Sequence, residues 1–206
     1  MKNNKNSKTW LAKRNKEYFF KKAKVHGYRS RSAYKLIEMN NKFKFIKNES
    51  FLLDLGSSPG GWSQVASEII NNGKILSTDI KNMEEIKKVN FILCDANDRN
   101  FYLKVESFFK KKIDVVISDM AANTTGNKNL DSFRTGELCL NALDLASGVL
   151  NENGVFISKI FMGSIFTEIQ EKAKKYFKKV IKYKPLSSKS ESKEIYIFCK
   201  GLSKIL

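Results

Sequence analysis

The sequence predicts an α/β protein with a seven-stranded, mostly parallel sheet that has helices on both faces. Short apolar runs alternate with helical patterns through most of the chain, and this alternation is typical of parallel strands joined by helical crossovers. The last two β-like runs, 179–184 and 194–200, are instead joined by nine residues, too few for a helical crossover. We therefore expect these two runs to form an antiparallel pair at the edge of the sheet.

Two helices are expected before the first strand. Residues 8–24 place apolar positions among lysines at helical spacing, and Gly27 is a typical stop signal. A second helical pattern covers 28–38, with apolar residues on one side and cations on the other. The cations on that side are Arg29, Arg31 and Lys35. A cationic helix face of this kind is suited to nucleic-acid phosphates.

The first strand and the turn that follows it are the stretch around which the chain is organised. FLLDLGSSPGGW (51–62) has the pattern of a short buried strand, a glycine-rich turn and the start of a helix. The glycines leave little side-chain bulk, so a ligand can approach the backbone closely and face the helix N-terminus. The stretch therefore predicts a site for a nucleoside-bearing ligand.

The remaining elements continue the alternation of strands and helices. The further strands are expected over 74–79, 89–95, 113–119 and 154–161. The further helices are expected before Lys112, before Leu150 and over 165–177.

Length and composition exclude several classes of protein. The 206 residues suffice for one sizeable core and are too few for two comfortable domains. No apolar run is long enough to span a membrane, and the start of the chain lacks a signal-peptide pattern. The cysteines, Cys94, Cys139 and Cys199, are scattered, so neither a disulfide framework nor a metal site is expected. We expect an intracellular, cytoplasmic protein, with a mitochondrial or other organellar location as the alternative.

Positive charge is concentrated at the two ends of the chain. The formal net charge is +17, of which residues 1–50 contribute +12 and residues 171–206 contribute +8, whereas residues 51–170 carry −3. A compositional bias towards lysine would have given the middle of the chain a basic surface as well. The uneven distribution favours a polyanion held by the two ends, and a merely solvated basic surface stays open as the alternative.

Two carboxylates narrow the choice of ligand at the glycine-rich turn. The turn lacks the full G-x-G-x-x-G spacing of a dinucleotide site and the Gly-Lys-Ser/Thr of a P-loop. Asp54 ends the first strand and Asp79 ends the next, which is unfavourable for a pyrophosphate but suits a cationic ligand that carries a ribose. S-adenosylmethionine has both features. The alternative is that Asp54 only caps the turn.

The chain contains, in this order, the motifs RSRSAYKL, DLGSSPGGWSQV, DMAANTTG, ISKIFMG and SKEIYIFCKG, together with the strand-end residues Asp79 and Asp95. In this order and spacing they resemble the FtsJ-type (RrmJ) family of RNA ribose 2'-O-methyltransferases. The resemblance runs from about Trp10 to Gly201. The chain departs from the family pattern at Ala122, where proline is frequent, and at Ser57 and Ser58, where alanine is frequent.

The resemblance implies a Rossmann-like, S-adenosylmethionine-dependent methyltransferase fold. Residues 51–206 would form the methyltransferase domain, and residues 1–50 a basic, helical, RNA-binding extension of the same domain. In the loop itself we expect cofactor contacts at Asp54, Gly56, Ser58 and Pro59. The resemblance adds contacts at Gly60, Trp62, Asp79, Asp95 and Asp119.

The resemblance also implies a catalytic tetrad. Its members here are Lys35, Asp119, Lys159 and Glu194. Asp119 and Lys159 end consecutive strands on the side of the sheet where ligands of open α/β folds bind. Two roles stay open for Lys159: it accepts the proton of the ribose hydroxyl, or it stays protonated and stabilises the developing alkoxide.

The RNA substrate is less closely specified. Methylation of a uridine ribose in large-subunit ribosomal RNA is favoured by the short chain and by its WLAKRNKEYFFKKAK opening. The alternative is a tRNA anticodon-loop methyltransferase, with cap methylation more distant. A non-catalytic RNA-binding protein is disfavoured because all tetrad positions are filled, and an NAD-dependent oxidoreductase is disfavoured by the loop spacing. We expect a monomer.

Overall fold

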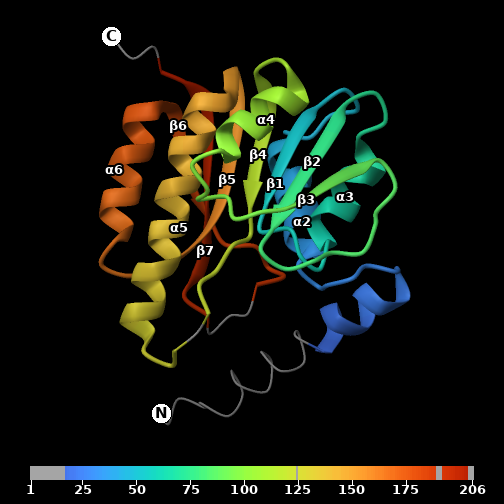
Figure 1. Cartoon of the computed structure of the whole chain (residues 1–206). Helices are drawn as coiled ribbons and strands as arrows, with labels where there is room; N and C mark the ends of the chain where they lie inside the picture. Colours follow the sequence, from blue (N-terminus) through green and yellow to red (C-terminus); the bar gives the residue numbers. More distant parts are fainter. Residues whose placement is uncertain (1–16, 124, 189–191, 204–206) are drawn as a thin grey trace.

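The computed structural model, which describes residues 17–123, 125–188 and 192–203, is built around one seven-stranded sheet (Figure 1). The strands are β1 (Phe51–Leu55), β2 (Lys74–Asp79), β3 (Val89–Leu93), β4 (Ile113–Ser118), β5 (Leu150–Phe161), β6 (Phe177–Tyr183) and β7 (Glu194–Leu202). Their order across the sheet is β3-β2-β1-β4-β5-β7-β6, and only β7 runs against the others. The predicted α/β fold with a mostly parallel sheet is confirmed.

Helices cover both faces of this sheet. They are α2 (Ala33–Phe43), α3 (Gly61–Ile69), α4 (Phe101–Phe109), α5 (Lys128–Val149) and α6 (Phe166–Tyr176). The helices α4, α5 and α6 pack on one face and share a hydrophobic core with it, whereas α2 and α3 pack on the other (Figure 1). Because α2 contributes Ala33, Leu36 and Met39 to the second core, this helix packs in one body with the sheet.

The last two strands form the predicted antiparallel pair, with one refinement. β7 lies between β5 and β6 and pairs antiparallel with both, so β6 is the edge strand. An antiparallel strand places its first residues beside the carboxyl end of its neighbour. Glu194 therefore lies opposite Phe161, and Tyr196 lies opposite Lys159. This arrangement brings residues of β7 to the edge where the parallel strands end.

The second predicted helix begins later than the sequence pattern indicated. The chain is helical over 17–25 and turns at Gly27, as predicted, while residues 8–16 of that predicted helix lie outside the described residues. The next helix starts at Ala33 rather than at Tyr28. The backbone N–H of Arg29 donates to Gln64 Oε1 at 2.8 Å, and Gln64 Nε2 donates to the carbonyl of Gly27 at 3.1 Å. These tertiary bonds to α3 hold the segment as a turn instead of a helix.

Two features of composition can be checked in the described part of the chain. Its three cysteines form no disulfide. None of the described helices has both the length and the apolar character that a membrane crossing requires.

Candidate active site

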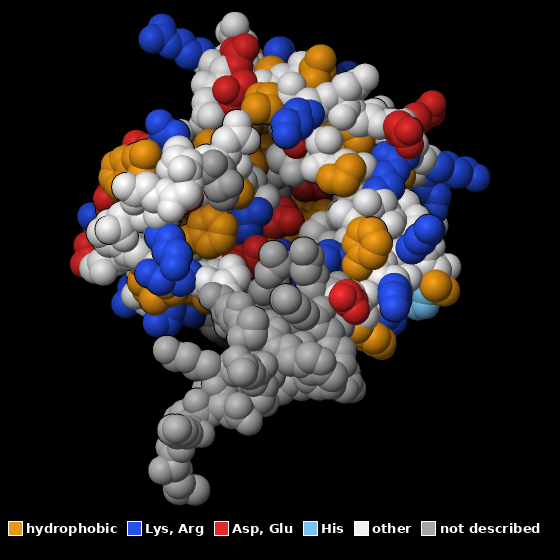
Figure 2. Space-filling view, turned by 90° about the horizontal axis from the view of Figure 1, so that it is seen from below, with side chains coloured by type: hydrophobic (Ala, Val, Ile, Leu, Met, Phe, Trp, Pro, Cys, Tyr) orange, Lys and Arg blue, Asp and Glu red, His pale blue; other side chains and the backbone are white. Residues whose placement is uncertain are grey.

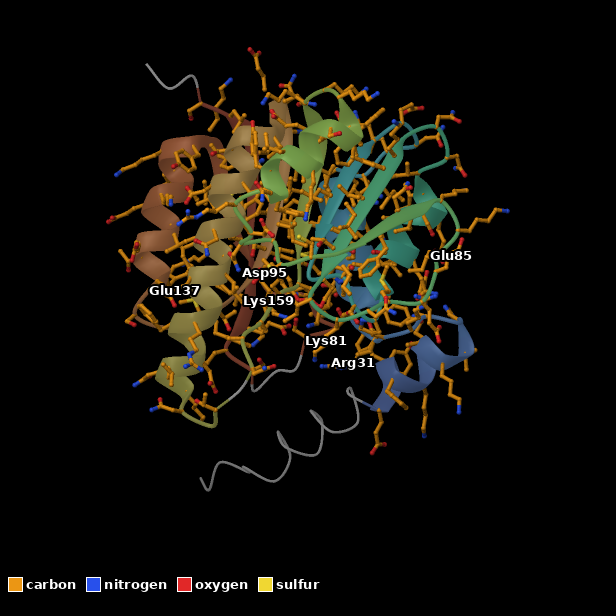
Figure 3. All side chains as sticks on the ribbon, in the orientation of Figure 1. Arg31, Lys81, Glu85, Asp95, Glu137 and Lys159 are labelled. Carbon is orange, nitrogen blue, oxygen red and sulfur yellow. The ribbon has the colours of Figure 1, made fainter. Side chains whose placement is uncertain are left out.

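The carboxyl ends of the parallel strands form one edge of the sheet, and the candidate site lies there. Figure 2 looks onto this edge and shows a hollow in which acidic and basic side chains meet. Asp95 and Lys159, labelled in Figure 3, lie at this edge; Asp95 is in the loop after β3, and Lys159 is on β5. Ligands of open α/β sheets bind outside the carboxyl ends of the strands. The position is therefore the expected one for a cofactor.

Two adjoining cavities follow the glycine-rich turn. The larger has a volume of about 330 Å³ and reaches from the turn to the ends of β2, β3 and β4. The smaller, of about 120 Å³, lies against the turn and the start of α3. Gly56, Ser58 and Asp119 line both. Of the other predicted cofactor residues, Asp79 and Asp95 line the larger cavity. The smaller cavity is lined by Asp54, Pro59 and Trp62.

A third hollow, of about 810 Å³, lies at the opposite edge of the sheet. Its lining includes Lys44, Asp114 and Lys200, and it contains none of the predicted site residues. Its size alone does not make it the site, because it lies away from the carboxyl ends of the parallel strands, where ligands of open α/β sheets bind.

Glycine is required at two positions of the turn. Gly56 has a φ of 72°, and a Cβ there would lie 2.3 Å from the side chain of Met120. Gly60 has a φ of 111° and lies at the N-cap of α3; a Cβ there would lie 2.7 Å from Ile86. A side chain at either position would strain the backbone and displace a neighbour. Gly60 lines neither cavity, and what the structure shows for it is the shape of the turn.

Backbone N–H groups orient the two carboxylates of the larger cavity. Asp79 Oδ2 accepts from the N–H of Ser58 at 2.9 Å, and Oδ1 accepts from the N–H of Lys81 at 2.8 Å. Asp95 Oδ1 accepts from both the backbone and the side-chain nitrogen of Asn97, each at 2.9 Å. Carboxylate oxygens have additional lone pairs, so both residues can still accept from the hydroxyl or amino groups of a ligand.

Asp54 does not cap the turn, contrary to the alternative drawn from the sequence. Its side chain is fully buried, and Oδ2 accepts from the hydroxyl of Ser63 on α3 at 2.6 Å. Oδ1 has no hydrogen-bond partner in the described structure. Burial raises the pKa of Asp54 to about 7, opposed by the Ser63 bond and reinforced by Asp119 and Asp79. A buried acceptor without a partner, in the wall of a cavity, fits a ligand that brings a donor.

The raised pKa of Asp54 predicts a pH-dependent stability. Its folded pKa of about 7 exceeds the ordinary value of 3.8, so its favourable contribution is complete below pH 3.8 and is lost as pH rises through 7. Asp54→Asn should therefore raise the stability of the cofactor-free protein at pH 8, by up to about 4 kcal/mol, and change it little at pH 4. Denaturant unfolding of both proteins across this range is the measurement; a difference that does not vary with pH would contradict it.

The four tetrad residues form two neighbouring ion pairs. Lys35 Nζ lies 2.6 Å from Glu194 Oε1, and Lys159 Nζ lies 3.1 Å from Asp119 Oδ1. Lys159 also donates to the backbone carbonyl of Asp119. Both lysines are largely buried, with exposed fractions of 5% for Lys35 and 8% for Lys159. Four residues that are far apart in the sequence are thus brought together beside the cofactor cavities.

Tyr196 joins the two ion pairs. Its hydroxyl donates to Asp119 Oδ1 at 2.7 Å, and Lys35 Nζ lies 5.7 Å from the centre of its ring. Burial would raise the pKa of Asp119, but Lys159, Lys35 and this hydroxyl together hold it below its ordinary value. Burial, Asp119 and Glu194 raise the pKa of Tyr196 well above its usual range. Asp119 is therefore ionised and Tyr196 is a permanent donor near neutral pH.

Two further residues contact the ion pairs and are not among those predicted from the sequence: Tyr196 and Ser188. Tyr196 follows Glu194 by two residues on one strand, so the alternation of strand side chains puts both on the same face of the sheet. That signal was available in the sequence. Ser188 Oγ donates to Glu194 Oε1 at 2.9 Å. Ser188 comes from the connection before β7, whose path no sequence pattern specified.

The predicted RNA-binding cations occupy different environments. Lys35 is buried in its ion pair, so it does not contribute to the outer surface. The guanidinium of Arg29 donates to the carbonyls of Pro59, Glu84 and Glu85 at 3.3, 2.7 and 2.8 Å, which ties the glycine-rich turn to the loop after β2. Arg31, labelled in Figure 3, lies at the edge of the sheet that carries the site and donates to the carbonyl of Ser187 at 3.4 Å. Of the three, Arg31 is the best placed to meet a substrate.

Comparison with known proteins agrees with this architecture. Residues 28–202 match the model of the family described as FtsJ-like methyltransferase. A relative from Pelagibacter ubique (strain HTCC1062), named ribosomal RNA large subunit methyltransferase E, is 48% identical over 202 residues, which are 98% of this chain and 100% of the relative. A crystal structure from Plasmodium falciparum, provisionally described as a ribosomal RNA methyltransferase, superposes with a TM-score of 0.75 at 34% identity and covers 85% of this chain and 98% of that one.

A more distant likeness bears on the fold. A Streptococcus mutans protein, provisionally described as a methyltransferase and crystallised with SAH, has a TM-score of 0.53 at 14% identity, over 82% of this chain and 95% of that one. SAH is the demethylated form of S-adenosylmethionine. The site fits S-adenosylmethionine, a cationic nucleoside, through its two adjoining cavities, its strand-end carboxylates and the unpaired Asp54 oxygen. S-adenosylmethionine is thus the cofactor, and the chain belongs to the FtsJ-like methyltransferase family.

Proposed function

We propose that this protein methylates the 2'-hydroxyl of a uridine ribose in large-subunit ribosomal RNA. The observation that carries the proposal is the set of two largely buried ion pairs beside the cofactor cavities, Lys159–Asp119 and Lys35–Glu194. A weakly acidic hydroxyl must lose its proton as it is methylated, and an aligned cluster of cations and carboxylates can assist that loss. The name of the Pelagibacter relative supports ribosomal RNA as the substrate.

Lys159 is the residue placed to act on the hydroxyl. Its Nζ contacts the carboxylate and the backbone carbonyl of Asp119, which fixes two of the three directions of the amino group. The third direction remains for the substrate, as an N–H in the protonated lysine or as a lone pair in the neutral one. When bound, S-adenosylmethionine supplies an electrophilic methyl group on a positively charged sulfur. The protein's task is to align the hydroxyl oxygen with that methyl group and to receive or balance the proton's charge.

The other members of the cluster position Lys159. Asp119 holds it directly, and Tyr196 on β7 holds Asp119. Lys35 and Glu194 close the cluster on the side of α2 and largely neutralise each other. Because each group is largely buried and is held by a hydrogen bond or an ion pair, the cluster needs little rearrangement when substrate binds, which is the requirement for electrostatic preorganisation.

Mapping of ribose methylation in total RNA after depletion of the protein tests the substrate. A 2'-O-methyl group blocks alkaline cleavage at its nucleotide, so each lost methylation appears as a new cleavage site. We expect a new site in large-subunit ribosomal RNA, at a uridine. Loss confined to a tRNA anticodon loop would favour the alternative substrate, and unchanged ribose methylation would contradict the proposal.

Asp79 is expected to accept from the ribose hydroxyls of the cofactor. Asp79→Ala should weaken S-adenosylmethionine binding by roughly 10- to 150-fold, because a hydrogen bond to a charged acceptor contributes about 1.5 to 3 kcal/mol. Glu85→Ala is the matched control, since Glu85, labelled in Figure 3, is exposed in the loop after β2 and lines neither cofactor cavity. Isothermal titration of the three proteins checks this; equal affinities would remove Asp79 from the site.

Electrostatic contact with RNA is proposed for Arg31 and for the basic N-terminal segment. Arg31→Glu, or deletion of residues 1–27, should weaken RNA binding and flatten its dependence on salt, while cofactor affinity is kept. Arg29→Ala is expected to weaken cofactor binding and to leave the salt dependence of RNA binding unchanged, because Arg29 holds the glycine-rich turn. Identical slopes of log affinity against log salt in Arg31→Glu and the wild type would show that Arg31 does not contact phosphate.

A further inference from the structure

One carboxylate outside the tetrad accepts an unusual number of hydrogen bonds. Glu38 lies on α2, three residues after Lys35. Its Oε1 accepts from the hydroxyl of Tyr183 at 2.6 Å and from the N–H of Leu186 at 2.7 Å. Its Oε2 accepts from both the N–H and the hydroxyl of Ser187, each at 3.2 Å. All four donors belong to the end of β6 and the connection that leads to β7.

The connection held by Glu38 leads directly to the tetrad. Ser188 follows the last of these donors in the chain, is buried, and donates through its hydroxyl to Glu194 Oε1 at 2.9 Å. The same oxygen of Glu194 pairs with Lys35. Helix α2 therefore contacts this region through two residues one turn apart. Glu38 accepts hydrogen bonds from residues 186 and 187, and Lys35 forms an ion pair with Glu194.

Other bonds in the described part of this connection lie within it: the N–H of Ser188 donates to the carbonyl of Pro185 at 3.0 Å, and Lys184 Nζ donates to the carbonyl of Ser192 at 2.6 Å. Leu186 is 83% exposed, so its side chain adds almost no apolar burial. Arg31 reaches the carbonyl of Ser187 only at 3.4 Å. A segment with few buried apolar contacts keeps its conformation through its hydrogen bonds, and bonds to a charged acceptor are the strong ones. Both carboxylate oxygens of Glu38 accept hydrogen bonds, whereas a glutamine side chain has only one acceptor oxygen.

We propose that Glu38 is a positioning residue for methyl transfer: it holds the connection between β6 and β7 so that Ser188 and Glu194 stay aligned with Lys35. Glu38 lines neither cofactor cavity and does not contact the Lys159–Asp119 pair. It therefore acts on the reaction through the second ion pair. The inference rests on the proposed methyl-transfer function of the tetrad.

The first test compares Glu38 with a matched glutamate. Glu38→Ala should lower the single-turnover rate of RNA methylation by about 10- to 100-fold, the loss that follows from displacing reacting groups by about 1 Å, and leave S-adenosylmethionine affinity unchanged. Glu68 on α3 also accepts a tyrosine hydroxyl, that of Tyr28 at 2.8 Å, but does not contact the connection. Glu68→Ala should methylate at the wild-type rate. Tyr183→Phe, which removes one donor and keeps the backbone bonds, should lose less than Glu38→Ala.

The second test asks whether the loss passes through Glu194. If it does, adding Glu38→Ala to Glu194→Ala should reduce the rate little further, whereas effects of independent residues multiply. Ser188→Ala leaves α2 intact, and adding it to Glu194→Ala should likewise reduce the rate little further. This variant replaces Glu38→Ala in the test if Glu38→Ala does not fold. A wild-type rate in Glu38→Ala, or in Ser188→Ala where that variant is used, would overturn the proposal, and so would losses that multiply.

Amide hydrogen exchange separates this proposal from the function on which it rests. Glu38→Ala should lose protection at the N–H groups of Leu186 and Ser187, whether or not RNA is methylated. Lost protection together with an inactive wild-type protein would contradict the proposed function alone. Unchanged protection would overturn the role of Glu38, and an active wild type with an equally active Glu38→Ala would do the same.

Discussion

Replacing Lys159 by methionine is expected to reduce methyl transfer by about 10²- to 10⁴-fold, the range typical of losing a general acid or base. Methionine is similar in size to lysine and keeps the packing against β7, but it can neither accept a proton nor stabilise an alkoxide. The rate should be measured under single-turnover conditions, so that product release does not mask the chemical step. Folding and S-adenosylmethionine affinity should stay close to those of the wild type.

A lysine elsewhere in the sheet provides the control for this variant. Lys200 is exposed on β7, at the end of the strand away from the site. Lys200→Met removes the same charge from the protein but should leave the single-turnover rate unchanged. If Lys159→Met transfers methyl at the wild-type rate, the assignment of Lys159 is wrong.

Lys159→Arg separates the two roles left open for this residue. Arginine stays charged and cannot accept the proton under ordinary conditions. Retained activity in Lys159→Arg would therefore assign Lys159 to alignment and stabilisation of the alkoxide. Loss of activity is consistent with proton acceptance by Lys159 or with a misplaced guanidinium group. Misplacement matters because Lys159 Nζ lies only 3.1 Å from Asp119 Oδ1.

Asp119→Asn is expected to have the second largest effect, a loss of roughly 10²- to 10³-fold in methyl transfer, as for removal of one preorganised electrostatic partner. The asparagine keeps the shape of the side chain but loses the charge that balances Lys159 and Lys35. Because the pKa of Asp119 already lies below 3.8, the loss should be the same at pH 6 and pH 8. Single-turnover rates at both pH values check this.

Asp114 is the matched control for Asp119. It lies near the start of β4, the strand that Asp119 follows, where it accepts from the N–H of Phe51 at 2.8 Å and from Asn151 Nδ2 at 2.7 Å. Asp114→Asn should therefore change stability more than activity. Equal losses of activity in the two variants would mean that charge at the site is not what Asp119 contributes.

The strand ends of the site could be predicted from the sequence because the rule for them is local. Asp79, Asp119 and Lys159 each stand at or near the end of an apolar run, and parallel strands end at the same edge. The glycine-rich turn was equally clear, since its residues are needed for the backbone φ values found at Gly56 and Gly60. No long-range information was required for these positions.

The pairing of Lys35 with Glu194 could not be derived from local pattern. It depends on the place of β7 between β5 and β6 and on the docking of α2, which are both tertiary. The resemblance to a known family supplied these two residues, and the structure brings them within 2.6 Å. Their catalytic roles stay predictions until the variants are measured.

The segment before α2 shows the opposite case, in which a local pattern misled. Its spacing predicted a helix from Tyr28 with Arg29 facing outward. Arg29 instead donates to three backbone carbonyls of two other loops, and its own N–H is taken by Gln64. Tertiary hydrogen bonds outweighed a helical preference that amounts to tenths of a kcal/mol per residue.

Nucleoside analysis of RNA methylated by the purified protein tests the central claim most directly. Large-subunit ribosomal RNA and tRNA would each be incubated with S-adenosylmethionine that carries a labelled methyl group, then digested to nucleosides and resolved by mass spectrometry. The account predicts label in 2'-O-methyluridine from the ribosomal RNA, and its near absence with Lys159→Met. Label in a base-methylated nucleoside, or equal labelling by Lys159→Met, would contradict it.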